Sequence, residues 1–380
     1  FKQKTAYEIS LGLVGSEMCI RDRSTSIRVL AFNTKSPEEI TVRGRLEYRD
    51  EDGNYRPVRF AKVILYDTNE PDGIDKKLRE TFTNENGEFI FTIDNNDGPG
   101  EDGRDIYIIL EAFSNVARVT NRDNLLYSWR SQSYINVSDG AIIQINMRIE
   151  DFSDALQAMN ATIEEYEWIK RWDPSFSIPQ ILIRWPNENW PHSHGNIIDL
   201  PAKNIFSWNR IVVYHEYAHC VMWFVYGNRW PPGRGPSPHF VFSESSPGFA
   251  ITEGWAEFMQ CAVSNNPQNL ADIGGNIEEN NWYNIIDTGD MDGDIIEGSV
   301  ASVFWDIFDP ANDDEIDGRF DLLWSIIKDD NPNSITEFLD QWFNKGYNYG
   351  CEIVDIYPVS YTHLRAHETE ADLVCRLLLE

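Results

Sequence analysis

The hydrophobic pattern of the chain changes its period once, near residue 150, and this change constrains the fold more than any other feature. From residue 39 to 149, apolar and polar residues alternate, as in strands with one buried face. Beyond residue 150, apolar residues recur every three to four positions, as in helices. Of the 13 Trp residues, only Trp129 precedes residue 160. We therefore expect a multidomain chain in which an all-β domain precedes a mainly helical α+β domain.

The first region reads as a β-sandwich of residues 39–149. Its predicted strands are 41–48, 60–66, 88–93, 105–113 and 142–149, separated by Gly-, Asn- and Asp-rich turns. Residues 57–63, followed by the turn from Thr83 through Gly87 to Phe89, resemble transthyretin-like domains related to the carboxypeptidase regulatory domain. The region contains no catalytic constellation, which favours a scaffold or adhesion role.

The second region, residues 150–357, reads as helices with a few strands. Helices are predicted at 151–170, 208–226, 246–264, around 295–308 and at 335–343, and strands at 178–185 and 194–200. Ser246 and Pro247 are typical of a helix start, as N-cap and first-turn proline.

The composition limits the partners. Asp and Glu number 62 against 32 Lys and Arg, which gives a net charge of -30. Such a charge would repel phosphate backbones and anionic lipid, so we expect no nucleic-acid partner. No run of 18 apolar residues occurs, so we expect no membrane span in this sequence. Cys220, Cys261 and Cys351 are scattered, so we expect neither a disulfide framework nor a CxxC metal site.

Both ends of the chain differ from the rest. Residues 1–23 and 358–380 resemble peptides translated from sequencing-adapter DNA. We therefore expect both segments to be non-native tails without an evolved role in the fold.

The sequence His215-Glu216-Tyr217-Ala218-His219 is the strongest chemical signal, because it lies within a predicted helix. Residues four apart share one helix face, so both imidazoles can bind one zinc ion. Glu216 then lies beside them as a general base for water. A zinc site of this kind needs a third protein ligand and an open position.

The segment Glu253-Gly254-Trp255-Ala256-Glu257 supplies candidates for that third ligand. Glu253 can complete a His/His/Glu site, and Glu257, one turn later, can accept the distal N–H of a zinc histidine. Gly254 is expected to let this helix approach the histidine helix closely. Glu297, which opens a second E-G-x-x-A string, is a weaker competitor because no carboxylate follows it at i+4.

HEYAH followed, after residues 220–252, by EGWAE resembles the gluzincin clan of zinc metallopeptidases. The resemblance implies a zincin-like domain, zinc on His215, His219 and Glu253, Glu216 as general base and Glu257 behind a zinc histidine. The clan usually also supplies a Tyr or His to stabilise the oxyanion, for which Tyr226, His239 and Tyr283 are candidates.

The sequence therefore favours a secreted or surface-attached zinc endopeptidase acting on protein or peptide substrates. The G-A-M-E-N motif of the aminopeptidases is absent from this sequence, which disfavours that alternative. A catalytically silent surface-binding or adhesion protein with a peptidase-like fold is the other rival. Acidic stretches at 290–297 and 309–318 could bind Ca²⁺, but neither fits the EF-hand pattern, so solvated acidic loops remain the alternative.

Overall fold

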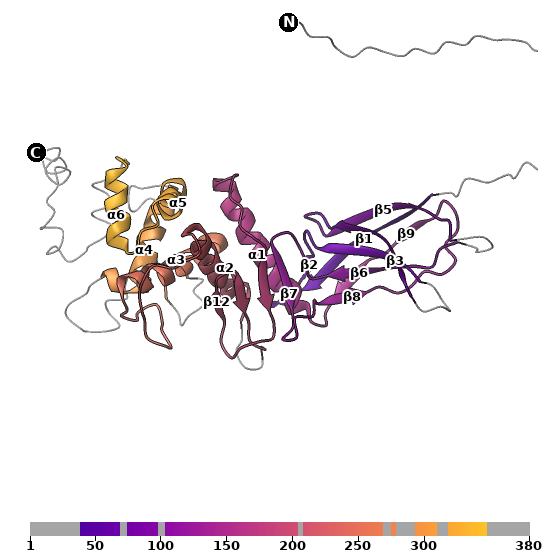
Figure 1. Ribbon diagram of the computed structural model, residues 1–380, viewed down its shortest axis with the longest axis horizontal. Coiled ribbons are helices and arrows are strands. Elements are labelled where there is room, and N and C mark those ends of the chain that lie inside the picture. The colour runs from indigo at the N-terminus through magenta and orange to yellow at the C-terminus, as the bar shows by residue number, and fades with distance from the viewer. Residues whose placement is uncertain are drawn as a thin grey trace, which may run out of the picture. The chain divides into compact units, whose positions relative to one another are not determined.

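The computed structural model describes residues 39–68, 74–97, 103–203, 208–268, 275–278, 293–309 and 318–347. All of these belong to one compact unit that begins at Glu38. The predicted tails 1–23 and 358–380 lie outside the described residues, as does Cys351. Within the described unit, a β-rich region is followed along the chain by a helical region (Figure 1).

The first sheet of the β-rich region is built around one long strand. β1 (Glu39–Arg49) pairs antiparallel with β2 (Tyr55–Pro57) and β5 (Glu88–Asp94), and parallel with β9 (Ile142–Gln144) and β10 (Met147–Ile149). Alternate residues of β1 and β5 are buried, including Val42, Leu46 and Phe91. This period of two is the one read from the sequence.

The second sheet of this region has the order β4-β3-β6-β8. Its strands are all antiparallel to their neighbours: β3 (Lys62–Asp67), β4 (Lys76–Phe82), β6 (Ile106–Glu111) and β8 (Ser128–Arg130). The buried side chains of both sheets belong to one hydrophobic core. The five predicted strands are present, but β2, β4, β8 and a further strand, β7 (Ala117–Thr120), were not predicted.

The predicted strand 142–149 is two strands, because the pairing with β1 is interrupted between them. Ile145 N–H donates to the Arg43 carbonyl oxygen at 2.8 Å, and the Asn146 side chain accepts from Arg45 N–H at 2.9 Å. A Cβ on Gly44 would lie 1.7 Å from the Ile145 carbonyl oxygen, so only glycine permits this approach.

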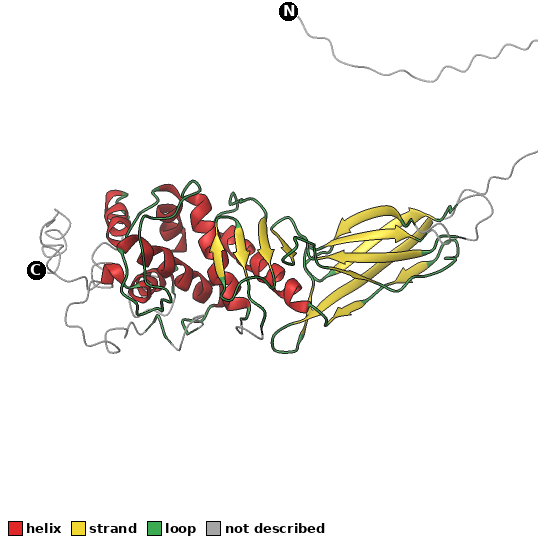
Figure 2. Cartoon of the chain, turned by 60° about the horizontal axis from the view of Figure 1, so that its bottom comes forward, coloured by secondary structure: helices red, strands yellow, loops and turns green. Residues whose placement is uncertain are grey.

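A third sheet, of order β12-β13-β11-β7, lies beside the helices (Figure 2). β11 (Ile181–Arg184) pairs parallel with β13 (Ile197–Asp199) and with β7 (Ala117–Thr120), and β12 (His192–His194) pairs antiparallel with β13. The predicted strand 194–200 is therefore a hairpin, and β12 forms the sheet edge among the described residues. Because β7 comes from the first region, the boundary at residue 150 in the sequence is not a boundary between sheets.

The helices of the second region carry the aromatic residues that the sequence concentrates there. They are α1 (Ser153–Trp172), α2 (Arg210–Val225), α3 (Pro247–Ser264), the 3-10 turn η2 (Gly293–Ile295), α4 (Glu297–Phe308), α5 (Phe320–Asp329) and α6 (Ile335–Asn344). Five of the α-helices match predicted segments, whereas α5 was missed. Trp255 of α3 lies at the centre of the aromatic core and stacks on Phe320 and Trp324 of α5.

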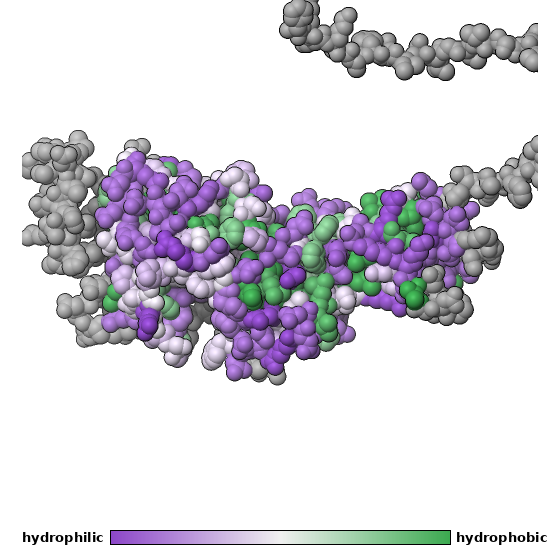
Figure 3. Space-filling model, in the orientation of Figure 1, coloured by the Kyte–Doolittle hydropathy of each residue, from purple (hydrophilic) through white to green (hydrophobic). Residues whose placement is uncertain are grey.

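The surface of the described unit is mostly hydrophilic (Figure 3), as the content of charged residues in the sequence leads one to expect. Most of the face seen in Figure 3 is hydrophilic, and apolar residues are more frequent over its strand-rich part. No described helix has the length and apolar character that crossing a bilayer requires. Cys220 and Cys261 are both buried, and neither forms a disulfide with another described residue.

Candidate metal centre

The HEYAH segment lies within α2, whose start is fixed by a side-chain cap. Asn209 accepts hydrogen bonds from Ile211 N–H and Val212 N–H, which satisfies two donors that the first turn leaves unpaired. The helix is buried on most sides. His215, Glu216 and His219 therefore project from a rigid element in the interior.

The EGWAE segment lies within α3, which begins at Pro247 as predicted. Ser246 precedes it with an extended backbone, but its hydroxyl accepts from Arg234 N–H at 2.7 Å instead of capping the helix. α3 packs against α2 and α4. A Cβ on Gly254 would lie 2.7 Å from Val300 of α4, so the expectation that Gly254 admits α2 was wrong. The glycine admits α4 instead.

The structure brings the three predicted ligands together. His215 Nε2 and His219 Nε2 are 3.1 Å apart, and Glu253 Oε2 lies 3.4 Å from the first and 3.0 Å from the second. Two imidazoles and one carboxylate form a donor set that suits zinc. Ligands about 2.0–2.1 Å from a tetrahedral ion lie about 3.4 Å from one another, which is close to these separations.

The unsatisfied atoms of the cluster also fit a cation. Glu253 Oε2 is buried and has no hydrogen-bond partner, although both imidazoles face it. Burial alone would raise the pKa of Glu253, but His219 and His215 outweigh burial and hold it well below its usual range. The carboxylate is therefore kept charged. The residues present fit a divalent ion on these three atoms.

Glu257 lies one turn behind the cluster, where it was predicted. Its Oε1 is 3.6 Å from His215 Nδ1, and its Oε2 accepts from the Gln260 amide. A carboxylate in this place favours a proton on Nδ1, which leaves the lone pair of Nε2 directed at Glu253.

A cavity of about 300 Å³ opens beside the cluster and is lined by His215, Glu216, His219 and Glu253. Its other walls combine apolar residues with polar ones: Pro191, Trp230, Pro231 and Phe249 beside His192, Ser193, His239 and Thr252. Burial raises the pKa of Glu216, and the two imidazoles oppose that shift only in part. Glu216 is thus a carboxyl group at a cavity wall whose proton affinity is enhanced, as general acid–base work requires.

Two further histidines line this cavity, each with a buried carboxylate behind it. His239 Nδ1 lies 3.1 Å from Glu297 Oε2, and His192 Nε2 lies 3.5 Å from Asp199 Oδ2. Glu297 lies beside His239, and these two residues and Glu253 offer ligand atoms within 4.8 Å of one another. His192 and Asp199 were missed by the sequence analysis, although His192-Ser193-His194 places two imidazoles on one face of a strand.

The other candidates for oxyanion stabilisation lie elsewhere. Tyr226 is buried and donates its hydroxyl to the Pro332 carbonyl oxygen at 2.8 Å, so it does not face the cavity. Tyr283 lies outside the described residues. Residues 290–292 and 310–317 of the two acidic stretches also lie outside the described residues, so the calcium site stays a prediction.

Comparison with known proteins adds a family to this geometry. Residues 180–349, a little under half of the chain, match the family model of the mycolysin C-terminal domain, which is found in zinc metallopeptidases. The matched segment contains His215, Glu216, His219 and Glu253. It indicates a peptidase-related protein.

Curated proteins give no match. Among solved structures, a 9R-lipoxygenase from Cyanothece PCC8801 has 12% identity and a TM-score of 0.21, over 40% of this chain and 27% of its own. A putative carbohydrate binding protein from Pseudomonas aeruginosa has 18% identity and a TM-score of 0.18, over 30% of this chain and 92% of its own. An (S)-allantoin synthase has 13% identity and a TM-score of 0.20, over 30% of this chain and 42% of its own. The chain thus spans about a quarter of the lipoxygenase, and likenesses at these TM-scores assign no fold.

Proposed function

We propose that the protein is a zinc-dependent peptidase, with a zincin-like helical domain, that hydrolyses peptide bonds within protein or peptide substrates. The observation that supports it most is the convergence of His215, His219 and Glu253 on one point beside Glu216 at a cavity wall. The match to a mycolysin domain over the same segment supports the same reaction class.

Zinc held by these three residues would acidify water and polarise a peptide carbonyl. Glu216 takes a proton from water onto its carboxylate and later donates it to the leaving amine. The apolar walls at Trp230 and Phe249 limit the access of further water to this carboxylate. Glu257 holds the His215 ring in its binding tautomer.

His239 is our candidate for stabilising the oxyanion. Its Nδ1 lies against Glu297, so Nε2 is the ring nitrogen that can donate to a substrate oxygen. The substrate strand pairs with β12, the sheet edge whose residues His192 and Ser193 line the cavity. β13 lies inside the sheet between β12 and β11 and is not available for this pairing.

Secretion or surface attachment is part of the proposal, since a zinc endopeptidase with a β-sandwich suits extracellular proteins. An aminopeptidase, which would require a free substrate amine, and a silent binding protein are the alternatives. Glu216 is needed for hydrolysis but not for zinc binding, so its presence favours an enzyme over a silent binding protein.

The decisive experiment is Glu216→Gln, in which the amide keeps the size of the side chain but cannot take a proton. We expect the variant to bind zinc like the wild type and to lose peptide hydrolysis by at least about 10²-fold, measured with a quenched peptide library. Hydrolysis near the wild-type rate would reject the general-base role. A wild-type protein that binds zinc and cleaves no peptide would favour the binding protein, and cleavage only of peptides with a free amine would favour the aminopeptidase.

A further inference from the structure

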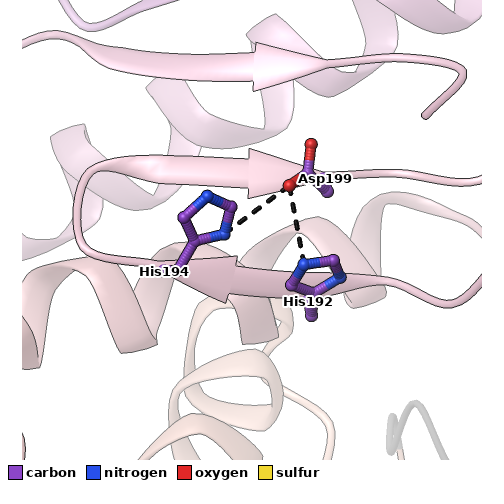
Figure 4. Close-up of side chains that lie close together, drawn as sticks. All are labelled: His192, His194 and Asp199. Carbon is purple, nitrogen blue, oxygen red and sulfur yellow. Dashed lines mark ion pairs between the residues drawn. The ribbon is translucent and has the colours of Figure 1, made fainter. Parts of the chain in front are cut away.

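A second cluster of ligand-type side chains lies on the β12–β13 hairpin. His192 and His194 are two residues apart on β12, so their rings lie on one face of the strand, with centroids 5.5 Å apart. Asp199 of β13 is paired with His192 across the ladder. Figure 4 shows its carboxylate directed between the two rings.

The distances in this cluster are those of ligands around an ion. His192 Nε2 and His194 Nδ1 each lie 3.5 Å from Asp199 Oδ2. These separations exceed the usual 2.7–3.2 Å of an N–H···O hydrogen bond. They are close to the roughly 3.4 Å expected between two ligands of one tetrahedral ion. The cluster at His215 has similar spacing.

The surroundings of two of these groups favour metal binding. His192 Nδ1 lies 3.3 Å from the Trp190 carbonyl oxygen, which can only accept, so Nδ1 carries a proton. The Nε2 lone pair then faces Asp199, an arrangement that a cation bound by both atoms would stabilise. Asp199 is fully buried and is fixed by hydrogen bonds from Arg184 and Asn187.

We propose that His192, His194 and Asp199 form a second metal site, for a divalent ion of the zinc, cobalt or nickel type. Two imidazoles and a carboxylate select such borderline ions over calcium and magnesium. The ion would fasten β12 to β13, and thereby hold the strand whose His192 and Ser193 form a wall of the cavity. This site does not depend on the proposed peptidase function.

Arg184 sets the strength of this site. Its guanidinium donates to both oxygens of Asp199, and its Nη2 lies 3.3 Å from His194 Nε2. The positive charge offsets the carboxylate and repels an ion nearby. We therefore expect weaker binding here than at the centre formed by His215, His219 and Glu253.

The test is titration of the metal-free full-length chain with Co²⁺, followed by the visible absorption of tetrahedral cobalt and by metal analysis after equilibrium dialysis. The wild type should bind two equivalents, the weaker one at the hairpin. His194→Ala should lose only the weaker equivalent, and Glu253→Ala only the tighter one. His194 is about half exposed, so its replacement should leave the circular dichroism spectrum unchanged.

Asn196→Ala, in the turn of the same hairpin, is the matched control and should keep both equivalents. The proposal is overturned if the wild type binds a single equivalent, or if His194→Ala binds as much cobalt as Asn196→Ala. If His194→Ala loses the hairpin equivalent but Glu253→Ala still binds two equivalents, the ligand set of the proposed peptidase is wrong and the second site stands.

Discussion

Trp255 Nε1 donates a hydrogen bond to the backbone carbonyl oxygen of Ala218, with a length of 3.1 Å. Trp255 stands between Glu253 and Glu257 in α3, and Ala218 stands next to His219 in α2. The bond therefore ties the two sequence motifs together directly, and it sets the register of one helix against the other. The indole is fully buried, so water cannot replace its partner.

Replacing Trp255 with Phe should lower both stability and metal affinity. The variant loses the buried hydrogen bond and leaves a cavity in the aromatic core, which together should reduce the free energy of unfolding by about 2–4 kcal/mol. Zinc should bind more weakly because Glu253 is no longer held in register with His219. Urea unfolding and zinc titration measure the two effects. Trp190→Phe, at a largely exposed position, is the control, and an equal loss there would contradict the argument.

The three carboxylates near the metal centre should differ in their effect on zinc. Glu253→Ala should abolish stoichiometric binding, because two imidazoles alone make an incomplete site. Glu257→Ala should weaken binding by roughly 10- to 100-fold, since it removes the partner of His215 Nδ1. Glu297→Ala should leave zinc in place. Metal analysis after dialysis measures the zinc content of each variant. Loss of zinc from Glu297→Ala would show that Glu297, and not Glu253, is the third ligand.

The sequence predicted the metal cluster better than the cavity around it. His215, Glu216 and His219 share one helix, so their mutual geometry follows from helix spacing alone. Glu253 required one further inference, from the family resemblance, and the structure places it within 3.4 Å of both histidines. These relationships are local or lie between two strongly patterned helices.

Relationships between distant segments could not be predicted in this way. Glu297 lies 58 residues from His239, and backbone bonds between the loop before α3 and the start of α4, such as Gly298 N–H to the Val241 carbonyl oxygen, bring them together. The strand β7 joins β11 across the intervening helix α1, which no local pattern encodes. α5 is a different case, because Phe320, Leu323 and Trp324 repeat at helical spacing and are all buried. That signal was present in the sequence.

His239 allows a test of the reaction that leaves the metal untouched. His239→Phe keeps an aromatic ring beside Phe249 but removes the donor at Nε2. We expect kcat to fall by about 10²–10³-fold, as for the loss of one oxyanion donor, with zinc content unchanged and little change in KM. Tyr226→Phe is the control, since it loses only the bond to Pro332 and should keep its activity. Equal kcat values for the two variants would remove His239 from the mechanism.

Glu165 of α1 should make stability depend on pH in an unusual direction. Both of its oxygens are buried without a hydrogen-bond partner, and burial raises its pKa well above the usual range. Tyr217 and Cys220 of α2 are close enough to interact with it electrostatically, and burial raises the pKa of each, so both stay neutral and give Glu165 no counter-charge.

The folded state therefore holds a proton on Glu165 that the unfolded chain releases near pH 4.5. Its contribution to stability is complete below that pH and is lost as the pH rises toward the folded pKa, by about 1.4 kcal/mol per pH unit. Glu165→Gln, which stays neutral, should flatten this slope and raise the melting temperature at pH 7 relative to the wild type, with the gain shrinking toward pH 4. Glu164→Gln, which instead weakens the hydrogen bond from Tyr214, should leave the slope unchanged. If the melting temperatures of the wild type and Glu165→Gln differ by the same amount at every pH from 4 to 8, Glu165 is charged, or paired, in the folded protein.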